Sequence, residues 1–342
     1  MTQPYSLHVG NCLDVLKTLD DCSIQTCITS PPYWGLRDYG VDGQLGLEKT
    51  PEEYVAKMVE VFREVRRVLR DDGTLWLNLG DSYWGGKGSN GSSKARRTAG
   101  ERGYTQSGGT LLIDTRPTDG NHDIIKPKDL VGIPWRVAFA LQADGWYLRQ
   151  DIIWHKPNPM PESVTDRCTK SHEYIFLLSK SERYYFDQEA IKEPLAQESI
   201  GRKNRKQNLI NRTGVGTLGK QIAEEIDAKH GYAGLALARN GKTGYSDDGL
   251  RNKRSVWTVS TRPFKEAHFA TFPPQLIEPC VKAGSKEGDT ILDPFNGAGT
   301  TGLVACRQNR NYIGIELNAE YAEIARKRIE NELNKAPLFA NA

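Results

Sequence analysis

Apolar positions along the chain follow two periods, one typical of short buried strands and the other typical of helices. Residues 51–69 show the clearest helical spacing, because apolar side chains recur there every three or four positions. These positions are Tyr54, Val55, Met58, Val59, Phe62, Val65, Val68 and Leu69. Thr50 and Glu53 form a capping box, and Pro51 occupies the first helical position, so the helix is predicted to begin there. The run Asp71-Asp72-Gly73 is predicted to end it.

Strands and helices alternate along the rest of the chain. The strands are predicted at Ser6–Val9, Ile24–Thr29, Thr74–Leu79, Leu148–Trp154, Glu173–Ser179, Asp289–Asp293 and Tyr312–Glu316. Further helices are predicted at Cys12–Leu19, Ile133–Asp144, Gln275–Ala283, Thr300–Asn309 and Glu320–Leu333. This alternation favours an α/β fold with a mostly parallel, doubly wound sheet covered on both faces. Ligands of such sheets bind beyond the carboxyl ends of the strands, so functional residues are expected in the loops at those ends.

Composition places the chain among ordinary globular proteins. Its 342 residues are 38% hydrophobic and 26% charged, which suffices for a large core and excludes a wholly disordered or fibrous protein. No apolar run approaches the roughly 20 residues of a membrane-spanning helix, and the first residues lack the features of a secretory signal. We therefore expect a cytoplasmic protein with no membrane partner. The six cysteines form no C-x-x-C pair, so no metal site is expected.

Positive charge is concentrated in two polar segments that interrupt the pattern of strands and helices. Residues 85–128 hold eight Lys and Arg against four Asp and Glu, and residues 190–255 hold thirteen against seven. Since the whole chain carries only +3, the remainder is acidic. Solvated surface loops and loops that contact phosphates both have this composition. The basic side chains that we single out as candidates are Arg96, Arg97, Arg202, Lys203, Arg205 and Lys206.

A glycine-containing loop joins the predicted strand 289–293 to the helix that begins near Thr300. Gly297 and Gly299 allow a tight turn and a close approach of a ligand to the backbone. Amide donors at the start of the helix favour a carboxylate or another anion. The next strand ends in Glu316, whose carboxylate suits ribose hydroxyls. This order is typical of a nucleoside site, although the loop has neither the dinucleotide nor the nucleoside-triphosphate motif; a tight turn without a ligand is the alternative.

A second loop, Thr29-Ser30-Pro31-Pro32-Tyr33-Trp34, follows the predicted strand 24–29. Its two prolines exclude a helix and remove two backbone donors, so Pro31 presents a rigid carbonyl acceptor beside the Ser30 hydroxyl. With the ring of Tyr33 next to both, the turn suits a flat ring that carries an amino group. A rigid aromatic turn used only for packing is the alternative.

Together, the two loops resemble a known family, the S-adenosylmethionine-dependent amino-directed DNA methyltransferases of the beta class, in which the catalytic turn precedes the cofactor loop. The resemblance covers nearly the whole chain outside the two basic segments. It implies a Rossmann-like methyltransferase fold with a circularly permuted motif order. Residues 29–33 are similar to the family's catalytic motif, in which Asp, Asn or Ser is followed by Pro-Pro and then Tyr or Phe. The catalytic residues implied are Ser30, Pro31, Pro32 and Tyr33.

The resemblance also implies a site for S-adenosylmethionine. Its residues are Asn11, Cys12, Phe272, Pro273, Asp293, Pro294, Phe295, Gly297, Gly299, Thr300, Thr301 and Glu316. Residues 268–273 resemble a segment that lines the methionine end of the cofactor, and Glu316 matches the ribose-binding acid. Residues 10–12 resemble a Gly-Asp-Cys element whose acid meets the adenine amino group. Asn11 stands in place of that acid, and its amide oxygen can accept the same hydrogen bond.

The implied reaction is methyl transfer to the exocyclic amine of a base flipped out of double-stranded DNA. The sulfonium of the cofactor carries a methyl group that is primed to leave, so neither a metal nor a covalent enzyme intermediate is needed. Hydrogen bonds from the amine to the Ser30 hydroxyl and the Pro31 carbonyl would localise its lone pair. In this family, members with a serine in the first motif position mostly methylate cytosine N4, which favours cytosine N4 over adenine N6 as the target. The residues expected near the target base or the DNA are Trp34, His155, Lys156 and Asn158, together with the six basic candidates.

We divide the chain accordingly. Residues 1–84 and 129–189 form the catalytic half of the methyltransferase domain, and residues 256–342 form the cofactor half. Residues 85–128 are a flexible basic insertion, and residues 190–255 are the expected DNA target-recognition insertion. Family habit implies a homodimer and a cognate restriction endonuclease, in a bacterial, archaeal or phage setting. An RNA or protein-amide methyltransferase and a nucleic-acid-binding module with an inactive site are the competing interpretations.

Overall fold

The computed structural model describes residues 4–36, 40–85, 122–195, 249–261 and 271–335. The chain divides into two compact units. The larger unit comprises residues 1–187 and 255–342, and the smaller one comprises residues 188–254.

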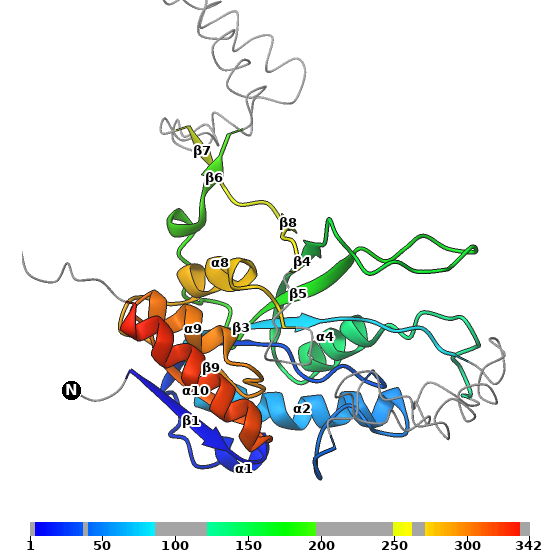
Figure 1. Ribbon diagram of the computed structural model, residues 1–342, viewed down its shortest axis with the longest axis horizontal. Coiled ribbons are helices and arrows are strands. Elements are labelled where there is room, and N and C mark those ends of the chain that lie inside the picture. The colour runs from blue at the N-terminus through cyan, green and yellow to red at the C-terminus, as the bar shows by residue number, and fades with distance from the viewer. Residues whose placement is uncertain (1–3, 37–39, 86–121, 196–248, 262–270, 336–342) are drawn as a thin grey trace, which may run out of the picture. The chain divides into compact units, whose positions relative to one another are not determined.

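An eight-stranded sheet runs through the larger unit in the order β1-β10-β9-β2-β3-β5-β4-β8 (Figure 1). Its strands are β1 (Tyr5–Val9), β2 (Ile24–Thr29), β3 (Leu69–Leu79), β4 (Tyr147–His155), β5 (His172–Ser179), β8 (Val256–Thr258), β9 (Thr290–Asp293) and β10 (Asn311–Glu316). Neighbouring strands pair in parallel, except that β5 is antiparallel to both β3 and β4. The prediction of a mostly parallel sheet is therefore confirmed.

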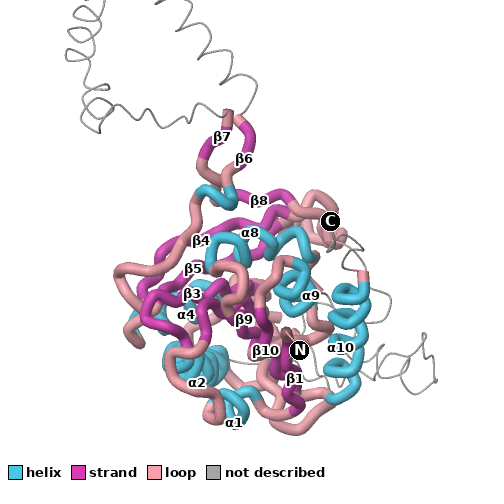
Figure 2. Tube along the Cα trace, turned by 90° about the vertical axis from the view of Figure 1, so that its left-hand side faces the viewer, coloured by secondary structure: helices cyan, strands magenta, loops and turns pink. Residues whose placement is uncertain are grey.

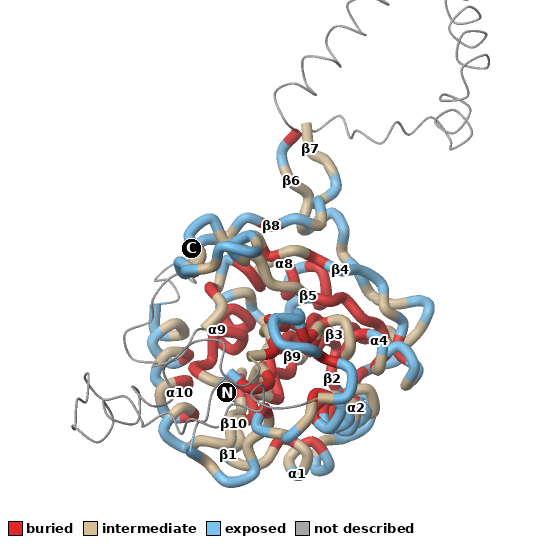
Figure 3. The backbone as a smooth tube through the Cα atoms, turned by 90° about the vertical axis from the view of Figure 1, so that its right-hand side faces the viewer, coloured by how far each residue is buried: buried red, intermediate tan, exposed pale blue. Residues whose placement is uncertain are grey.

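Helices cover both faces of the sheet (Figure 2). One face carries α1 (Cys12–Leu16), α2 (Pro51–Val68) and α4 (Ile133–Ala143), and the other carries α8 (Pro274–Gly284), α9 (Thr300–Arg307) and α10 (Ala319–Asn334). In the second row α9 packs against both α8 and α10 and is almost wholly buried, as Figure 3 shows. The predicted α/β class with two helical layers is confirmed. None of the helices that the structure describes is both long enough and apolar enough to cross a membrane.

The periodicity of α2 matches the face that it buries. Its fully buried apolar side chains are Tyr54, Met58, Val61, Phe62, Val65 and Val68. The helix begins as predicted, because the Thr50 hydroxyl accepts a hydrogen bond from the Glu53 amide at 3.1 Å. The Glu53 carboxylate accepts from the Lys49 amide at 3.0 Å, one residue before the expected partner. The two bonds together supply acceptors for amides at the helix start.

The run Asp71-Asp72-Gly73 does not end the helix as predicted, because α2 ends already at Val68 and the chain passes directly into β3 at Leu69. Pairing between β2 and β3 jumps from Ile24–Leu69 to Thr26–Thr74, so the extra residues of β3 form a bulge. The backbone of this bulge finds partners outside the ladder. The carbonyl of Asp72 accepts from the Tyr185 amide at 2.9 Å, and that of Gly73 accepts from the Lys180 amide at 3.2 Å.

Two smaller differences follow from element length. The predicted helix 12–19 ends already at Leu16. Strand β8 was not predicted, because it is only three residues long and Trp257 is its single buried side chain. In the smaller unit, β6 (Glu193–Pro194) pairs antiparallel with β7 (Leu250–Arg251) after a short 3-10 turn, Glu189–Ile191.

Candidate functional site

A cavity of about 210 Å³ lies at the carboxyl ends of β1, β2, β9 and β10. Most of the residues proposed from the sequence for catalysis and cofactor binding line it, although they come from opposite ends of the chain. Those residues are Asn11, Cys12, Ser30, Pro31, Pro32, Tyr33, Phe272, Asp293, Pro294, Phe295, Gly297, Thr300 and Glu316. The two loops meet here because β2 and β9 are neighbours in the sheet.

Asp293, the last residue of β9, links the two loops directly. Its carboxylate accepts hydrogen bonds from the Thr29 hydroxyl at 2.6 Å, the Thr301 hydroxyl at 2.7 Å and the Phe295 amide at 3.0 Å. Burial raises the pKa of this carboxyl to about 6. Because Thr29 immediately precedes Ser30, Asp293 fixes the start of the Ser-Pro-Pro-Tyr turn relative to the glycine loop.

The glycine loop has the backbone conformation that its sequence predicts. Gly297 and Gly299 have φ angles of 50° and 75°, in the left-handed region where glycine carries no steric penalty. A Cβ atom on Gly299 would lie 2.7 Å from the Cβ of Ala325, so α9 and α10 could not pack this closely with a larger residue there. Glycine at position 299 is thus required both by the turn and by helix packing.

Glu316 closes the loop from the end of β10. Its Oε2 accepts from the Gly297 amide at 2.7 Å, and its Oε1 accepts from the Asn318 amide at 2.9 Å. Burial raises the pKa of Glu316 above its usual value. Since each carboxylate oxygen has a second lone pair, both oxygens remain able to accept a hydrogen bond from a ligand hydroxyl.

Asn11 and Cys12 form the wall of the cavity at the start of α1. The Asn11 side chain caps this helix, because its Oδ1 accepts from the Leu13 amide at 2.9 Å. One lone pair of the oxygen expected to meet an adenine amino group is therefore already used. Burial raises the pKa of the Cys12 thiol to about 12, so this group is neutral and contributes an apolar surface.

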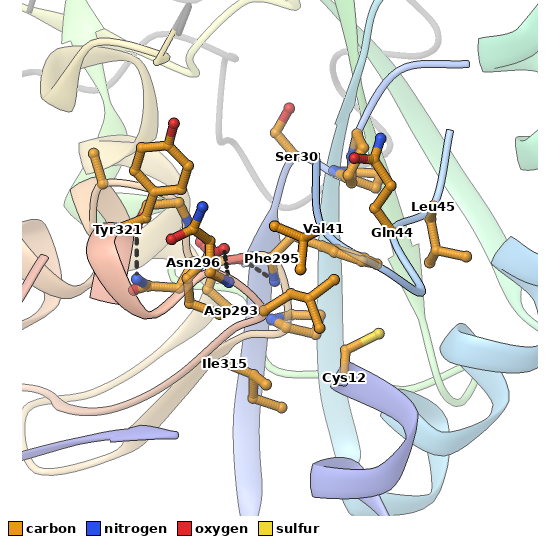
Figure 4. Close-up of a pocket in the computed structure, with 18 of the residues that line it drawn as sticks. Cys12, Ser30, Val41, Gln44, Leu45, Asp293, Phe295, Asn296, Ile315 and Tyr321 are labelled. Atoms are coloured by element: carbon orange, nitrogen blue, oxygen red, sulfur yellow. Dashed lines mark hydrogen bonds between the residues drawn. The ribbon is translucent and has the colours of Figure 1, made fainter. Parts of the chain in front are cut away.

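Further apolar surface comes from residues that the sequence did not single out. Figure 4 shows Val41, Leu45 and Ile315 near Phe295 and Cys12, with Tyr321 and Asn296 on another side of the cavity. The segment around Val41 and Leu45 contains several glycines, which is typical of an irregular loop. Two apolar residues in such a loop, both half-buried in the structure, are the signal that could have identified this wall.

The Ser-Pro-Pro-Tyr turn is held by side chains from three other elements. The Pro32 carbonyl accepts from the Tyr54 hydroxyl of α2 at 2.8 Å. The Tyr33 hydroxyl lies 2.8 Å from Glu173 Oε2, 3.2 Å from Asn78 Oδ1 and 3.4 Å from Ser30 Oγ. Burial, followed by the nearby Glu173 carboxylate, raises the pKa of Tyr33 well above its usual value.

Asn78 and Glu173 are therefore site residues that sequence reasoning missed. Each is a polar residue within a strand that is otherwise mostly apolar, which is the only local signal that either provides. They come together because β3 and β5 are paired, and this pairing is a property of the sheet order.

The candidate residues for contacts with the target base or DNA have mixed positions. Trp34 is 1% exposed, stacks on Trp84 and donates its Nε1 proton to the Glu48 carbonyl at 2.9 Å. The expectation that it contacts DNA is corrected, because its ring is packed in the core. Lys156 forms an ion pair with Glu173 beside the catalytic turn.

His155 and Asn158 connect the end of β4 to the last residue of β8 and to the segment that follows it. His155 Nδ1 lies 3.1 Å from the Thr258 hydroxyl. The Asn158 side chain forms two hydrogen bonds with the backbone of Thr261, at 3.1 and 3.2 Å. Their role towards DNA stays a prediction.

Several other candidates lie away from the cavity or outside the described residues. Pro273 is the N-cap residue of α8, Gly299 is the N-cap residue of α9, and Thr301 is buried behind the cavity against Asp293. The six basic candidates, at positions 96, 97, 202, 203, 205 and 206, lie outside the described residues.

Solved structures match the fold along nearly the whole chain. The PvuII DNA methyltransferase (cytosine-N4-specific) has a TM-score of 0.58 at 18% identity, over 98% of this chain and 93% of that one. A putative DNA modification methylase from Thermus thermophilus, complexed with S-adenosyl-L-methionine, has a TM-score of 0.52 at 22% identity, over 96% and 95%. These similarities confirm the predicted Rossmann-like methyltransferase fold.

Sequence comparison extends the similarity to much closer relatives. Residues 24–327 match the sequence profile of a family described as DNA methylase. The chain is 44% identical to the type II methyltransferase M.Cfr9I of Citrobacter freundii, over 96% of this chain and 88% of the relative. It is 43% identical to the type II methyltransferase M.SmaI of Serratia marcescens, over 94% and 89%. On these matches, and with the two loops joined at one cavity, the chain belongs to the N6/N4 DNA methylase family.

Proposed function

We propose that the protein is a site-specific DNA methyltransferase that transfers a methyl group from S-adenosylmethionine to the exocyclic N4 of a cytosine flipped out of double-stranded DNA. The observation that carries the proposal is the joint placement of Ser30 and the glycine loop on one cavity. Asp293 holds these two loops together through Thr29 and Thr301.

The residues of the cavity fit S-adenosylmethionine. The carboxylate of Glu316 has a free lone pair on each oxygen, which suits a ribose diol. The wall made by Cys12, Phe295 and Ile315 suits a flat heterocycle. The left-handed glycines leave positions 297 and 299 without side chains, so a ligand can approach the backbone there. When bound, the cofactor supplies a sulfonium-linked methyl group that leaves readily.

The protein's own part of the reaction is to bind and orient the amine. The lone pair of an exocyclic amine is delocalised into the base, so the nitrogen is a weak nucleophile. Hydrogen bonds donated by the amine to Ser30 Oγ and to the Pro31 carbonyl would localise that lone pair. The rigid turn, fixed by Asp293 and by the Tyr54 hydroxyl on Pro32, then holds the nitrogen in line with the methyl carbon.

The choice of cytosine N4 rests on Ser30, because a serine in this motif position goes mostly with cytosine in the family that the sequence resembles. Adenine N6 is the second candidate, since adenine presents the same amino group beside a ring nitrogen. The relatives are named as type II methyltransferases, which supports a DNA substrate over RNA or a protein amide.

DNA contacts outside the cavity are proposed for the two basic insertions. Their positive charge supports contacts to phosphates and a strong dependence of binding on salt. We assign target recognition to residues 190–255, which lie between the catalytic half and the cofactor half of the sequence. A homodimer and a cognate restriction endonuclease complete the proposal.

The decisive experiment labels plasmid DNA with the purified protein and isotopic S-adenosylmethionine, and then identifies the modified nucleoside. We expect N4-methylcytosine. N6-methyladenine would replace the cytosine assignment with the second candidate, and 5-methylcytosine as the sole product would refute the mechanism.

Ser30→Ala tests the role of the turn separately. It should lower turnover at least about a hundredfold while the dissociation constant of the cofactor changes little, because Ser30 acts on the amine. Ser23→Ala is the matched control, since the Ser23 hydroxyl is exposed and bonds only to the Asp20 carbonyl among the described residues. Equal losses of turnover and cofactor affinity in Ser30→Ala would show that the catalytic role is wrongly assigned to this turn.

A further inference from the structure

We infer that Tyr33, with Glu173 and Asn78, makes the Ser30 hydroxyl a hydrogen-bond acceptor towards the target amine, and that Glu173 is therefore a positioning residue. This inference rests on the proposed function, because it concerns how the catalytic turn addresses an amino group. It follows from the direction of each hydrogen bond around the Tyr33 hydroxyl.

The direction of the hydrogen bond between Asn78 and Tyr33 is fixed by a second contact of Asn78. Its Nδ2 lies 3.0 Å from the Tyr174 carbonyl, which can only accept a hydrogen bond. The amide nitrogen of Asn78 must therefore face that carbonyl, and Oδ1 must face the Tyr33 hydroxyl at 3.2 Å. The same nitrogen also lies 3.3 Å from Glu173 Oε2, which agrees with this orientation.

Glu173 gives the Tyr33 hydroxyl a second acceptor. Its Oε2 is 2.8 Å from the phenol oxygen, while its Oε1 receives the ammonium group of Lys156. The side chains of Glu173 and Lys156 are only 16% and 19% exposed, so this pair is largely shielded from water. A carboxylate has no proton to give, and Glu173 is both the nearer and the charged acceptor, so Tyr33 donates its proton to Glu173.

The single proton of the phenol is thus committed to the Glu173 carboxylate. The phenol oxygen still has lone pairs, and Ser30 Oγ is 3.4 Å away. Only the Ser30 hydroxyl can be the donor in that contact, because the Tyr33 proton is already used. The one proton of Ser30 then points at Tyr33, and the lone pairs of its oxygen are left for another donor.

This polarity matches an amino group and disfavours the opposite arrangement. A serine hydroxyl that rotated freely could donate its proton to the ring nitrogen next to the amine, and would then present less of its lone pairs to the amine. The contact with Tyr33 disfavours that orientation, because it gives the Ser30 proton an acceptor on the protein. The amine is then drawn to Ser30 by an oxygen that is oriented before the base arrives, which lowers the reorganisation needed in the transition state.

The test uses the full-length protein, with DNA and labelled S-adenosylmethionine, and compares Tyr33→Phe, Glu173→Gln and the double variant. Tyr33→Phe should lower kcat about three- to tenfold and Glu173→Gln about tenfold, the range of one hydrogen bond. The KM for DNA and the dissociation constant of the cofactor should stay within about twofold of the wild-type values. In the double variant Glu173→Gln should add little to the effect of Tyr33→Phe, because Glu173 acts through the phenol.

Glu332→Gln is the matched control, since the Glu332 side chain is similarly shielded, at 15% exposed, and pairs with Arg307 on α9. It should leave kcat unchanged. If Glu173→Gln does not fold, Tyr33→Phe alone must still lower kcat, because it keeps the ring in place.

Two results would overturn the inference. Either both single variants keep the wild-type kcat, or the fold reductions in kcat of the single variants multiply in the double variant. Failure of the proposed function is distinguishable, since the wild-type protein itself would then produce no methylamino base.

Discussion

Gly299 permits a quantitative test of how the cofactor loop is built, because the structure offers separate controls for its two constraints. Gly299→Ala would place a side chain on a residue with φ of 75° and only 2.7 Å from the Cβ of Ala325. The left-handed conformation costs an L-residue about 1–2 kcal/mol. Overpacking of a close contact costs about 1–3 kcal/mol more, since carbon atoms prefer separations of about 3.5–4 Å.

Two other glycines each carry one of these penalties alone. Gly288 has φ of 82° with no atom within 4 Å of an added Cβ, so Gly288→Ala measures the conformational cost. Gly302 lacks a positive φ, but an added Cβ would lie 2.5 Å from the ring of Tyr312, so Gly302→Ala measures the packing cost. Gly299→Ala should therefore lower the free energy of unfolding by about 2–5 kcal/mol, close to the sum of the two controls.

Urea denaturation measures the three free energies of unfolding, and calorimetric titration measures cofactor affinity. We expect Gly299→Ala to weaken cofactor binding at least about tenfold, because relief of the contact with Ala325 must displace the loop. Gly288→Ala should retain wild-type affinity, since Gly288 lies at the opposite end of β9 from the cavity. If Gly299→Ala were no less stable than Gly288→Ala, the close packing of α9 on α10 would not constrain the loop, and the reasoning would be refuted.

Two further predictions concern the linkage between the loops. The pKa of Asp293 is raised from the usual 3.8 to about 6, so the free energy of unfolding should fall by roughly 3 kcal/mol as the pH rises from about 4 through 6. Asp293→Asn should remove that part of the pH dependence of the urea midpoint. Identical pH profiles of the variant and the wild-type protein would contradict this prediction. Gly80→Ala should lower kcat about tenfold or more while cofactor affinity is retained, because the added Cβ would lie 2.5 Å from the Tyr33 ring. An unchanged kcat would show that the position of this ring is unimportant.

Local patterns in the sequence predicted those features whose causes are local. The helix at Pro51 was predictable because its cap, Thr50, directly precedes the eighteen residues that carry the apolar spacing. The glycine loop was predictable because glycine adopts the backbone angles at 297 and 299 without a steric penalty. The bulge in β3 was not, since the run Asp71-Asp72-Gly73 has turn composition and is held extended by Tyr185 and Lys180, which are more than a hundred residues away.

The same distinction applies to the site. Ser30 and Glu316 stand out because each ends or follows a strand and belongs to a recognisable motif. Glu173 and Asn78 belong to no motif, and their importance arises from a contact across 95 residues that only the pairing of β3 with β5 creates. The prediction that Trp34 contacts DNA was wrong for a related reason. Its neighbour in the motif, Tyr33, lines the cavity, whereas the ring of Trp34 packs on Trp84.

The position of β2 in the middle of the sheet has a consequence for how the protein is made. All six residues of β2 are buried, yet its partner β9 lies more than 260 residues later in the chain. At a synthesis rate of about 5–20 residues per second, the edge of this buried strand that pairs with β9 stays unpaired for roughly 15–50 s on the ribosome. An unpaired strand edge is a template for aggregation, so the nascent chain is exposed to aggregation through β2 until β9 has been synthesised.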